Sequence, residues 1–329
     1  MKFLIAGAGA IGAYLGARMA RAGFDVTLFA RGPHLEAMRA HGVKVQSSEE
    51  TFQVRPRVAG SLEEAGPADV VFLCVKAHSL PQLVPPLKSV LAPDTIVVST
   101  QNGIPWWYFE GCAVPAEGIH LERIDPGRVI SSVIEARRVV GAIVYLSTEI
   151  SSPGIIQHIA GNRITLGEPD GSCSERSRRI AEALEASGLR CPITTDIRQE
   201  IWVKLLGNAS FNPVSALTRA TVIRMVRDPD ASTLIRNIMQ EVESVSRSLG
   251  RKLPISIEQR FAAAEKVGEH KTSMLQDLEA GRPLELEGVV GAVLELAEHL
   301  GVPVPHLKTV YSCAKLLGEE NRARSPTKR

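Results

Sequence analysis

The sequence predicts an α/β protein with a parallel sheet over residues 1–195 and an all-α domain over residues 196–329. In the first half, short apolar runs alternate with helical segments, which is typical of βαβ units. A glycine-rich turn joins the first apolar run to the first helical segment. After residue 197 helical periodicity dominates, so the domain boundary is placed near Thr195.

The elements of the first domain follow from short apolar runs and from helical spacing that ends at a glycine. The apolar run at 69–75 is typical of a parallel strand covered on both faces. The predicted strands are 3–6, 25–30, 69–75, 95–99, 141–148, 155–159, 163–166 and 191–195, and the predicted helices are 10–22, 35–41, 80–91 and 174–187.

Residues 104–140 interrupt this alternation. The aromatic group at 106–109 precedes a polar stretch rich in charges, glycine and proline, which predicts an insertion or a long hairpin. Beyond it, helical spacing predicts the second domain, and residues 321–329 are expected to fray. The predicted helices of this domain are 197–211, 231–249, 256–269, 285–300 and 305–318.

The composition is that of a soluble globular protein, with 44% apolar and 22% charged residues. A net charge of +2 and 5% aromatic residues indicate no polyanionic partner, so we expect no nucleic-acid binding. The five cysteines are scattered and form no CxxC pair, which argues against a disulfide framework or a metal site and favours the cytoplasm. No apolar run is long enough for a membrane span.

The amino-terminal apolar run after Lys2 superficially resembles a signal peptide, but its glycine spacing indicates a different purpose. Arg18 and Arg21 follow at once, and no clean cleavage site is evident. This run matches G-x-G-x-x-G between a strand and a helix, the Rossmann-type context in which the motif is informative. The six residues of the motif, which we predict to bind a dinucleotide, are Gly7, Ala8, Gly9, Ala10, Ile11 and Gly12.

Each glycine of the motif has a physical purpose in that setting. Gly7 permits the tight turn, Gly9 lets the backbone approach a pyrophosphate, and Gly12 allows close packing of helix on strand. The first N–H groups of the helix then face the phosphates. The alternative is a glycine-rich turn without a ligand.

The end of the second strand indicates which dinucleotide is bound. An NAD site usually has a carboxylate there, whereas this chain has Arg31, whose planar cation suits a 2′-phosphate. We therefore predict NADPH/NADP+. Lys76, which ends the strand at 69–75, is a second candidate for a cofactor phosphate, and Asn102, after the next strand, could orient substrate or nicotinamide. The alternatives are that Arg31 and Lys76 are solvated surface cations and that Asn102 is a plain turn residue.

Lys204, Asn208 and Asn212 recur at a spacing of four on an otherwise apolar helix. This spacing stacks them on one face, and burying such groups is costly unless they face a polar cavity. Desolvation would lower the pKa of the lysine and suit it to proton transfer near neutrality. The alternative is an exposed lysine with asparagines that cap the helix before Pro213.

Residues 273–276 match the capping box S-x-x-Q, which predicts that a helix starts at Ser273. Its free N–H groups and the serine hydroxyl would suit a carboxylate, although capping alone explains the pattern equally well. Glu285 and Glu287 lie at the head of the next predicted helix, where carboxylates are ordinary dipole partners.

These motifs together resemble the ketopantoate reductase (2-dehydropantoate 2-reductase) family. The resemblance covers most of the chain, through GAGAIG, Arg31, VKA at 75–77, QNG at 101–103, WVKLLGNASFNP at 202–213 and SMLQD with Glu285. It implies a Rossmann-type amino-terminal domain and an α-helical carboxy-terminal domain. It also implies NADPH-dependent reduction of 2-oxopantoate to (R)-pantoate, a step toward coenzyme A.

The resemblance assigns roles position by position. Lys204 is similar to the catalytic proton donor, and Glu285 to the active-site glutamate. Asn102 is similar to the asparagine that touches both cofactor and substrate. The remaining matches are substrate-binding residues at Asn208, Asn212 and Ser273 and the pair at the 2′-phosphate, Arg31 and Lys76.

Three departures from the family concern the substrate more than the chemistry. The family's TTHGA-like segment is replaced at 144–149, Val222 stands where a polar residue is frequent, and 104–140 is longer than usual. One alternative is therefore reduction of another bulky 2-oxo acid beneath a lid at 106–109. These aromatics are equally explained as core of the insertion or as a dimer contact. An alternative of another class is a non-catalytic NADPH-binding sensor. A homodimer through the apolar helices is plausible.

Overall fold

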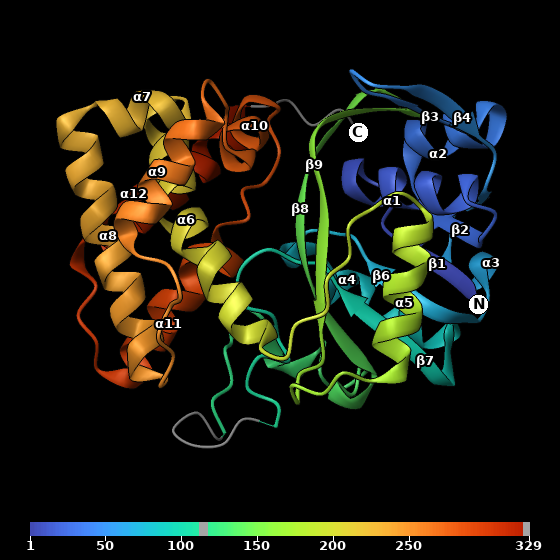
Figure 1. Cartoon of the computed structure of the whole chain (residues 1–329), viewed down its shortest axis with the longest axis horizontal. Helices are drawn as coiled ribbons and strands as arrows, with labels where there is room; N and C mark the ends of the chain where they lie inside the picture. Colours follow the sequence, from blue (N-terminus) through green and yellow to red (C-terminus); the bar gives the residue numbers. More distant parts are fainter. Residues whose placement is uncertain (112–117, 325–329) are drawn as a thin grey trace. The chain divides into compact units, whose positions relative to one another are not determined.

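The computed structural model describes residues 1–111 and 118–324, and the chain divides into two compact units (Figure 1). Among described residues, the first unit comprises 1–101, 106–111 and 125–197, and the second comprises 102–105, 118–124 and 198–324. The segment 104–140 thus contributes to both units. Its described residues up to 138 form turns, including the 3₁₀ turns Pro126–Arg128 and Ala136–Arg138, and the expected hairpin is not found among them.

A nine-stranded mixed sheet forms the centre of the first unit, in the order β4-β3-β9-β8-β7-β6-β1-β2-β5. All pairings from β5 to β8 are parallel, whereas β8 with β9 and β3 with β4 are antiparallel. The predicted fold class is confirmed, with a sheet that is mixed rather than wholly parallel. The strands are β1 (Lys2–Ala6), β2 (Asp25–Phe29), β3 (Val43–Gln46), β4 (Thr51–Val54), β5 (Arg57–Ala59), β6 (Ala68–Leu73), β7 (Leu91–Ser99), β8 (Val139–Ser152) and β9 (Ile155–Gly167).

The strand predictions were wrong in three places. The short half-polar strands β3, β4 and β5 were missed. Strand β9 was predicted as two strands, 155–159 and 163–166. In the structure Gly161 has a φ of +79° inside one continuous strand, and a Cβ there would lie 2.2 Å from the Tyr145 carbonyl oxygen. Residues 191–195 form only an isolated bridge, between Leu166 and Ile193.

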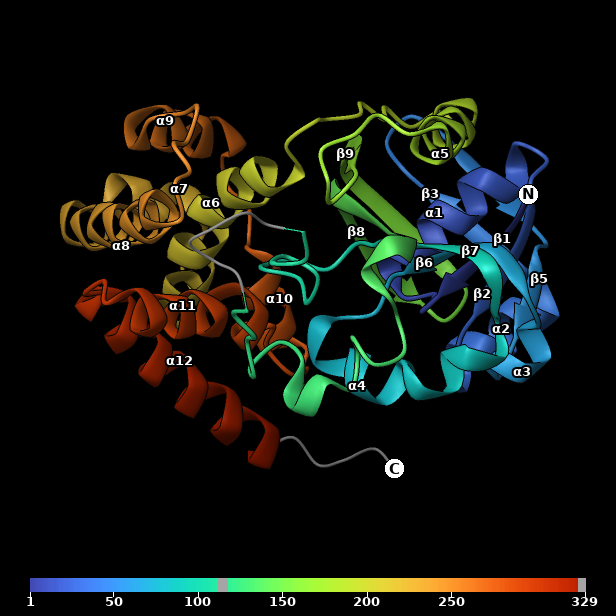
Figure 2. The ribbon, with the colours of Figure 1, turned by 90° about the horizontal axis from the view of Figure 1, so that it is seen from below.

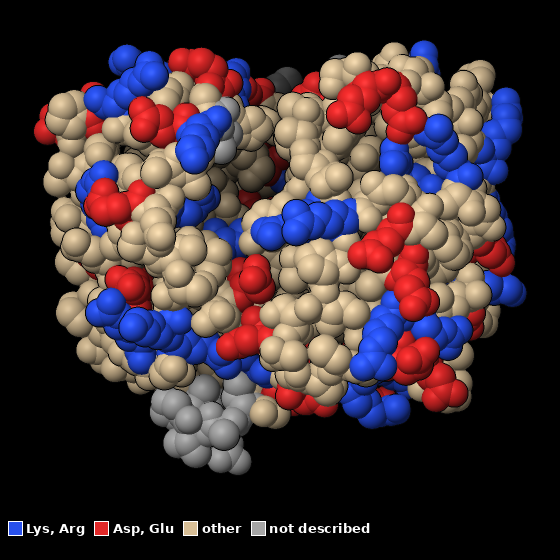
Figure 3. All heavy atoms as spheres, viewed as in Figure 1, with Lys and Arg blue, Asp and Glu red and all other residues tan. Residues whose placement is uncertain are grey.

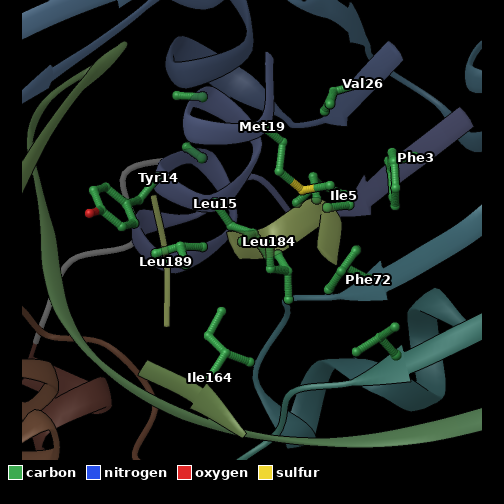
Figure 4. Close-up of a cluster of buried hydrophobic side chains, with 14 of the residues drawn as sticks. Phe3, Ile5, Tyr14, Leu15, Met19, Val26, Phe72, Ile164, Leu184 and Leu189 are labelled. Carbon is green, nitrogen blue, oxygen red and sulfur yellow. The ribbon is translucent and has the colours of Figure 1, made fainter. Parts of the chain in front are cut away.

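Helices α1 and α5 lie side by side and cover one face of this sheet (Figures 1 and 2). Leu15 and Met19 of α1 and Leu184 of α5 are buried with Ile5 and Phe72 of the strands (Figure 4). Each fully buried side chain of this size stabilises the fold by about 1.5–3 kcal/mol. The helices of this unit are α1 (Ala10–Arg21), α2 (Gly32–His41), α3 (Leu62–Ala65), α4 (Leu80–Leu83) and α5 (Glu175–Ala186).

The helix predicted at 80–91 is instead the single turn α4 followed by a 3₁₀ turn, Pro85–Ser89. Pro85 and Pro86 explain the difference, because neither has an N–H group to continue an α-helical hydrogen-bond ladder. Helix α5 begins as predicted, and the Ser174 hydroxyl accepts a hydrogen bond from the Ser177 N–H group.

The second unit is helical. Helix α6 continues through Pro213 to Thr218, so the end predicted at 211 was wrong, and α7 was missed. Helix α12 extends to Arg324, which corrects the frayed tail for 321–324, while 325–329 lie outside the described residues. The helices are α6 (Ile197–Thr218), α7 (Val222–Arg227), α8 (Pro229–Ser248), α9 (Ile257–Val267), α10 (Ser273–Glu279), α11 (Ala292–Leu300) and α12 (Pro305–Arg324), with a π-helical turn at Glu287–Gly291.

Charged groups of both signs are interspersed on the face in Figure 3, so no single charge dominates that face. Within the described residues, no helix is both long enough and apolar enough to cross a membrane.

A buried carboxylate holds the start of α12. The Glu241 side chain on α8 accepts hydrogen bonds from the His306 N–H (2.9 Å) and the Leu307 N–H (2.8 Å), and it contacts the His306 imidazole. Glu241 is 9% exposed. The cap therefore ties α12 to α8 while it satisfies two otherwise unpaired helical donors.

We expect Glu241→Ala to lower the free energy of unfolding by about 1–3 kcal/mol, because two buried N–H groups lose their acceptor. Urea denaturation would measure the change. Glu243→Ala, on the same helix, is the control: it removes only an ion pair with Arg247, worth about 0.3–0.5 kcal/mol. Equal losses from both variants would contradict the capping role.

Candidate active site

The glycine turn between β1 and α1 has the shape that a bound pyrophosphate needs. Gly7 has a φ of +110°, and a Cβ there would lie 2.4 Å from Val75 Cγ1. A Cβ on Gly12 would lie 2.2 Å from the Gly7 carbonyl oxygen. A Cβ on Gly9 would have no atom within 4 Å. Gly9 is the N-cap of α1, so no side chain caps the first N–H groups of the helix. The helix N–H groups and the open backbone therefore fit a dinucleotide phosphate.

Arg31 and Lys76 lie at the same edge of the sheet as this turn. They follow β2 and β6, which pair in parallel with β1 on its two sides. Arg31 is exposed, and its guanidinium carbon lies 5.3 Å from the centroid of the Phe29 ring. Lys76 is half-buried at the start of the 3₁₀ turn Ala77–Ser79. Ligands of open α/β sheets bind at this carboxyl edge.

In the second unit, three predicted site residues form one hydrogen-bonded cluster. Lys204 Nζ donates to Asn102 Oδ1 at 2.7 Å, and Asn102 Nδ2 donates to Glu285 Oε2 at 3.2 Å. Asn102 follows β7, Lys204 lies on α6, and Glu285 precedes the π-helical turn. The two bonds use both ends of the amide, so they fix its orientation between the cation and the carboxylate.

Burial lowers the pKa of Lys204 to about 8, and the negative charge of Glu285 partly opposes this change. Desolvation disfavours the ammonium form, whereas a nearby carboxylate favours it. A lysine with this pKa is still largely protonated at neutral pH and gives up its proton more readily than an exposed lysine. The cluster is therefore suited to general acid catalysis.

Close backbone packing holds Asn102 in this position. Gly103 has a φ of +85°, and a Cβ there would lie 1.9 Å from the Gly288 carbonyl oxygen. The Ile104 N–H group donates to that same oxygen at 3.1 Å. The chain after Asn102 thus rests directly on the π-helical turn that follows Glu285. The sequence marked Asn102 and Gly103 as a turn but contained no signal for its partner at Gly288.

Asn208 and Asn212 follow Lys204 at successive turns of α6 and share its face. Asn212 is buried, whereas Lys204 and Asn208 are half-buried as whole residues, although the ammonium group of Lys204 itself is desolvated. The face predicted from the spacing is thus present, with its deepest point at Asn212.

The capping box predicted at Ser273 was wrong. The N-cap of α10 is Thr272, whose hydroxyl accepts from the Leu275 N–H group, while the Gln276 side chain donates to the Lys271 carbonyl. Ser273 is the first helical residue, as the predicted helix start requires, and it is exposed. A capping box does occur at the start of α9, where Ser256 and Gln259 bond reciprocally.

The aromatic group at 106–109 supplies core rather than a lid at two of its positions. Trp107 and Tyr108 are each 1% exposed in the first unit. The Trp107 ring occupies the space beside Gly141, where a Cβ would lie 2.7 Å from the ring. The interpretation of these aromatics as core is therefore the one that the structure supports.

Family models match both halves of the chain. Residues 3–171 match "Ketopantoate reductase PanE/ApbA", and residues 196–318 match "Ketopantoate reductase PanE/ApbA C terminal". The chain belongs to the ketopantoate reductase family. The resemblance noted from the sequence motifs is thereby confirmed.

Relatives of known sequence or structure cover nearly the whole chain. It is 46% identical to the 2-dehydropantoate 2-reductase of Mesorhizobium japonicum over 97% of this chain and 98% of that protein. The crystal structure of a protein described as a ketopantoate reductase from Ralstonia solanacearum MolK2 aligns with a TM-score of 0.93 at 37% identity, and the alignment covers 98% of each chain. The 2-dehydropantoate 2-reductase of Methylococcus capsulatus aligns at 0.82 and 30% identity, over 100% of this chain and 99% of that one.

We expect Gly103→Ala to destabilise this ketopantoate reductase family member more than backbone strain alone would. Gly301→Ala is the matched control, because Gly301 has a φ of +65° but nothing within 4 Å of the added Cβ. Gly301→Ala should lower the free energy of unfolding by about 1 kcal/mol, because alanine is strained in the left-handed backbone conformation. Gly103→Ala adds a clash with backbone and should cost clearly more in urea denaturation. A loss no greater than the control's would contradict the close approach.

Proposed function

We propose that this protein reduces 2-dehydropantoate (ketopantoate) to (R)-pantoate with NADPH, a step toward coenzyme A. The observation that carries the proposal is the contact of Lys204 with Asn102, backed by Glu285, in a chain of the ketopantoate reductase family. A sensor that only binds NADPH gives no reason for a desolvated lysine in this arrangement.

The nicotinamide, when bound, supplies the hydride that reduces the ketone carbon. Lys204 donates its proton to the ketone oxygen as negative charge develops there. Asn102 holds the lysine Nζ at 2.7 Å, so the ammonium is oriented before the substrate arrives. Glu285 favours the charged form of Lys204 and so keeps a proton available at neutral pH.

The remaining site residues hold the two reactants in this proposal. Asn208, Asn212 and Ser273 bind the carboxylate and hydroxyl groups of the substrate. The glycine turn would hold the cofactor pyrophosphate, because the space beside Gly9 is open to it. Arg31 and Lys76 would hold the 2′-phosphate, and Asn102 would also contact the cofactor. The residues of the glycine turn are Gly7, Ala8, Gly9, Ala10, Ile11 and Gly12.

On this reading residues 1–195 bind the cofactor, and residues 196–329 bind the substrate. The scattered cysteines, which form no CxxC pair in the sequence, fit a reducing cytoplasm, which we propose as the site of action. Assembly into a homodimer through the helical unit stays a prediction from its apolar helices.

Lys204→Ala should lower turnover of ketopantoate by about 10²–10⁴-fold while NADPH still binds, because only the proton donor is removed. Initial rates of NADPH oxidation, with NADPH affinity measured by fluorescence, would show this. Lys308→Ala, an exposed lysine on α12, is the control and should keep wild-type rates. Near-normal turnover without Lys204 would overturn its role.

The same assays test the substrate and the pH dependence. The wild-type enzyme should prefer ketopantoate to bulkier 2-oxo acids, and the reverse preference would change the substrate but keep the chemistry. Reduction should decline as the pH rises through about 8, because the neutral amine of Lys204 has no proton to donate. A flat profile from pH 6 to 10 would contradict Lys204 as the acid.

Arg31→Ala should raise the KM for NADPH about 10- to 100-fold and leave the KM for NADH nearly unchanged, since a charge-assisted bond to the 2′-phosphate is lost. Arg39→Ala, an exposed arginine of α2 that pairs with Glu64, is the matched control. An unchanged preference between the two dinucleotides would overturn the role of Arg31.

A further inference from the structure

Three side chains beyond the proposed site form a closed triangle of hydrogen bonds in the second unit. Arg123 Nη1 donates to Glu287 Oε2 at 2.8 Å and to the Tyr311 hydroxyl at 2.5 Å. The Tyr311 hydroxyl donates in turn to Glu287 Oε1 at 2.7 Å. Both carboxylate oxygens of Glu287 are therefore occupied. We call these residues the Arg123 triangle.

The triangle is fixed from two further directions. The Glu295 carboxylate on α11 accepts hydrogen bonds from the backbone N–H groups of Glu122 (2.7 Å) and Arg123 (3.1 Å). Tyr311 on α12 is 7% exposed, and the Arg123 guanidinium carbon lies 5.2 Å from the centroid of its ring. An ion pair that shares a buried hydroxyl and an anchored backbone is better held than an isolated surface pair.

The triangle is attached to the turn that also holds the proposed site. Glu287 is the first residue of the π-helical turn and lies two residues after Glu285. Gly291, the last residue of the turn, leaves room for the Glu287 side chain: a Cβ there would lie 2.3 Å from Glu287 Oε2 and 3.2 Å from Arg123 Cδ. The carbonyl of Gly288, on the same turn, accepts from Ile104, two residues after Asn102.

A π-helical turn contains one residue more than the α-helical turn it replaces, and such turns are rare without support. Each residue of an α-helix adds about 100° of rotation. A change of the turn from π to α geometry would therefore swing the preceding residues, Glu285 among them, by an angle of that order. Contacts that hold the π geometry also hold Glu285 toward Asn102 and Lys204.

We propose that Arg123 and Tyr311 are positioning residues that act through Glu287 to hold the π-helical turn, and with it Glu285 and Asn102, against Lys204. This inference rests on the proposed reductase function for its kinetic consequence. It gives the segment 118–124 a function in the site, although this part of the chain interrupts the Rossmann-type pattern of the sequence.

Arg123→Met and Tyr311→Phe test the proposal, because each removes hydrogen bonds to Glu287 and keeps most of the side-chain volume. We expect kcat for ketopantoate reduction to fall about 10- to 100-fold, as when a reacting group is slightly misplaced, with the KM for NADPH unchanged. The alkaline limb of the pH profile should move to lower pH, because a loosened Glu285 supports the ammonium of Lys204 less.

Two further variants separate positioning from general stability. Arg123→Lys keeps one donor for Glu287 and should recover part of the lost turnover. Arg247→Met removes an exposed ion pair with Glu243 on α8 and should change neither kcat nor the pH profile. If the Tyr311→Phe variant does not fold, Arg123→Met is sufficient to test the positioning role. Arg123 is the partly exposed member of the triangle, so its replacement disturbs the core less.

Hydrogen exchange of peptides covering 102–105 gives a readout that does not depend on activity. In Arg123→Met the Ile104 amide should exchange faster than in wild type, because its acceptor on the π-helical turn is released. Faster exchange with unchanged kcat and pH profile would overturn the positioning role, and so would unchanged exchange. If the wild type reduces no 2-oxo acid, the proposed function fails, and the exchange result alone then decides whether the triangle holds the turn.

Discussion

The close approach of Gly103 to the Gly288 carbonyl determines where the polar groups of the second unit lie. Gly103 tolerates little change, because a Cβ there would lie 1.9 Å from that oxygen. The contact joins a segment near residue 102 to the π-helical turn near residue 288, so the side chains of Asn102 and Glu285 come within hydrogen-bond distance. The Lys204 ammonium then has an oriented acceptor.

Burial of the Lys204 ammonium disfavours its charged form, and the same effect makes the lysine a better proton donor. Desolvation alone would favour the neutral amine, and the carboxylate of Glu285 limits that effect, so the pKa settles at about 8. The pKa of Lys204 thus reflects two opposing effects, the desolvation of its ammonium group and the charge of Glu285. Small shifts of the π-helical turn would change both the proton affinity and the orientation of the lysine.

Local patterns predicted most of the elements and failed where a local signal had two meanings. The strand predicted to stop at 159 continues through Gly161 with a bulge in β9, and the helix predicted to end at 211 continues through Pro213 in α6. The S-x-x-Q pattern at Ser273 occurs one residue after the true cap, Thr272. In each case the surrounding packing, which the local sequence does not contain, selects between the two meanings.

The sequence by itself determined the glycine turn and the polar face of α6. Both depend on spacing within a few residues, where backbone sterics and helical periodicity decide the outcome. Only the tertiary structure decided that Asn102 meets Lys204, 102 residues away, and Glu285, 183 residues away. It also decided that Arg123 and Tyr311 donate hydrogen bonds to Glu287 on the π-helical turn. Such meetings depend on how whole helices pack, and no spacing within one segment encodes them.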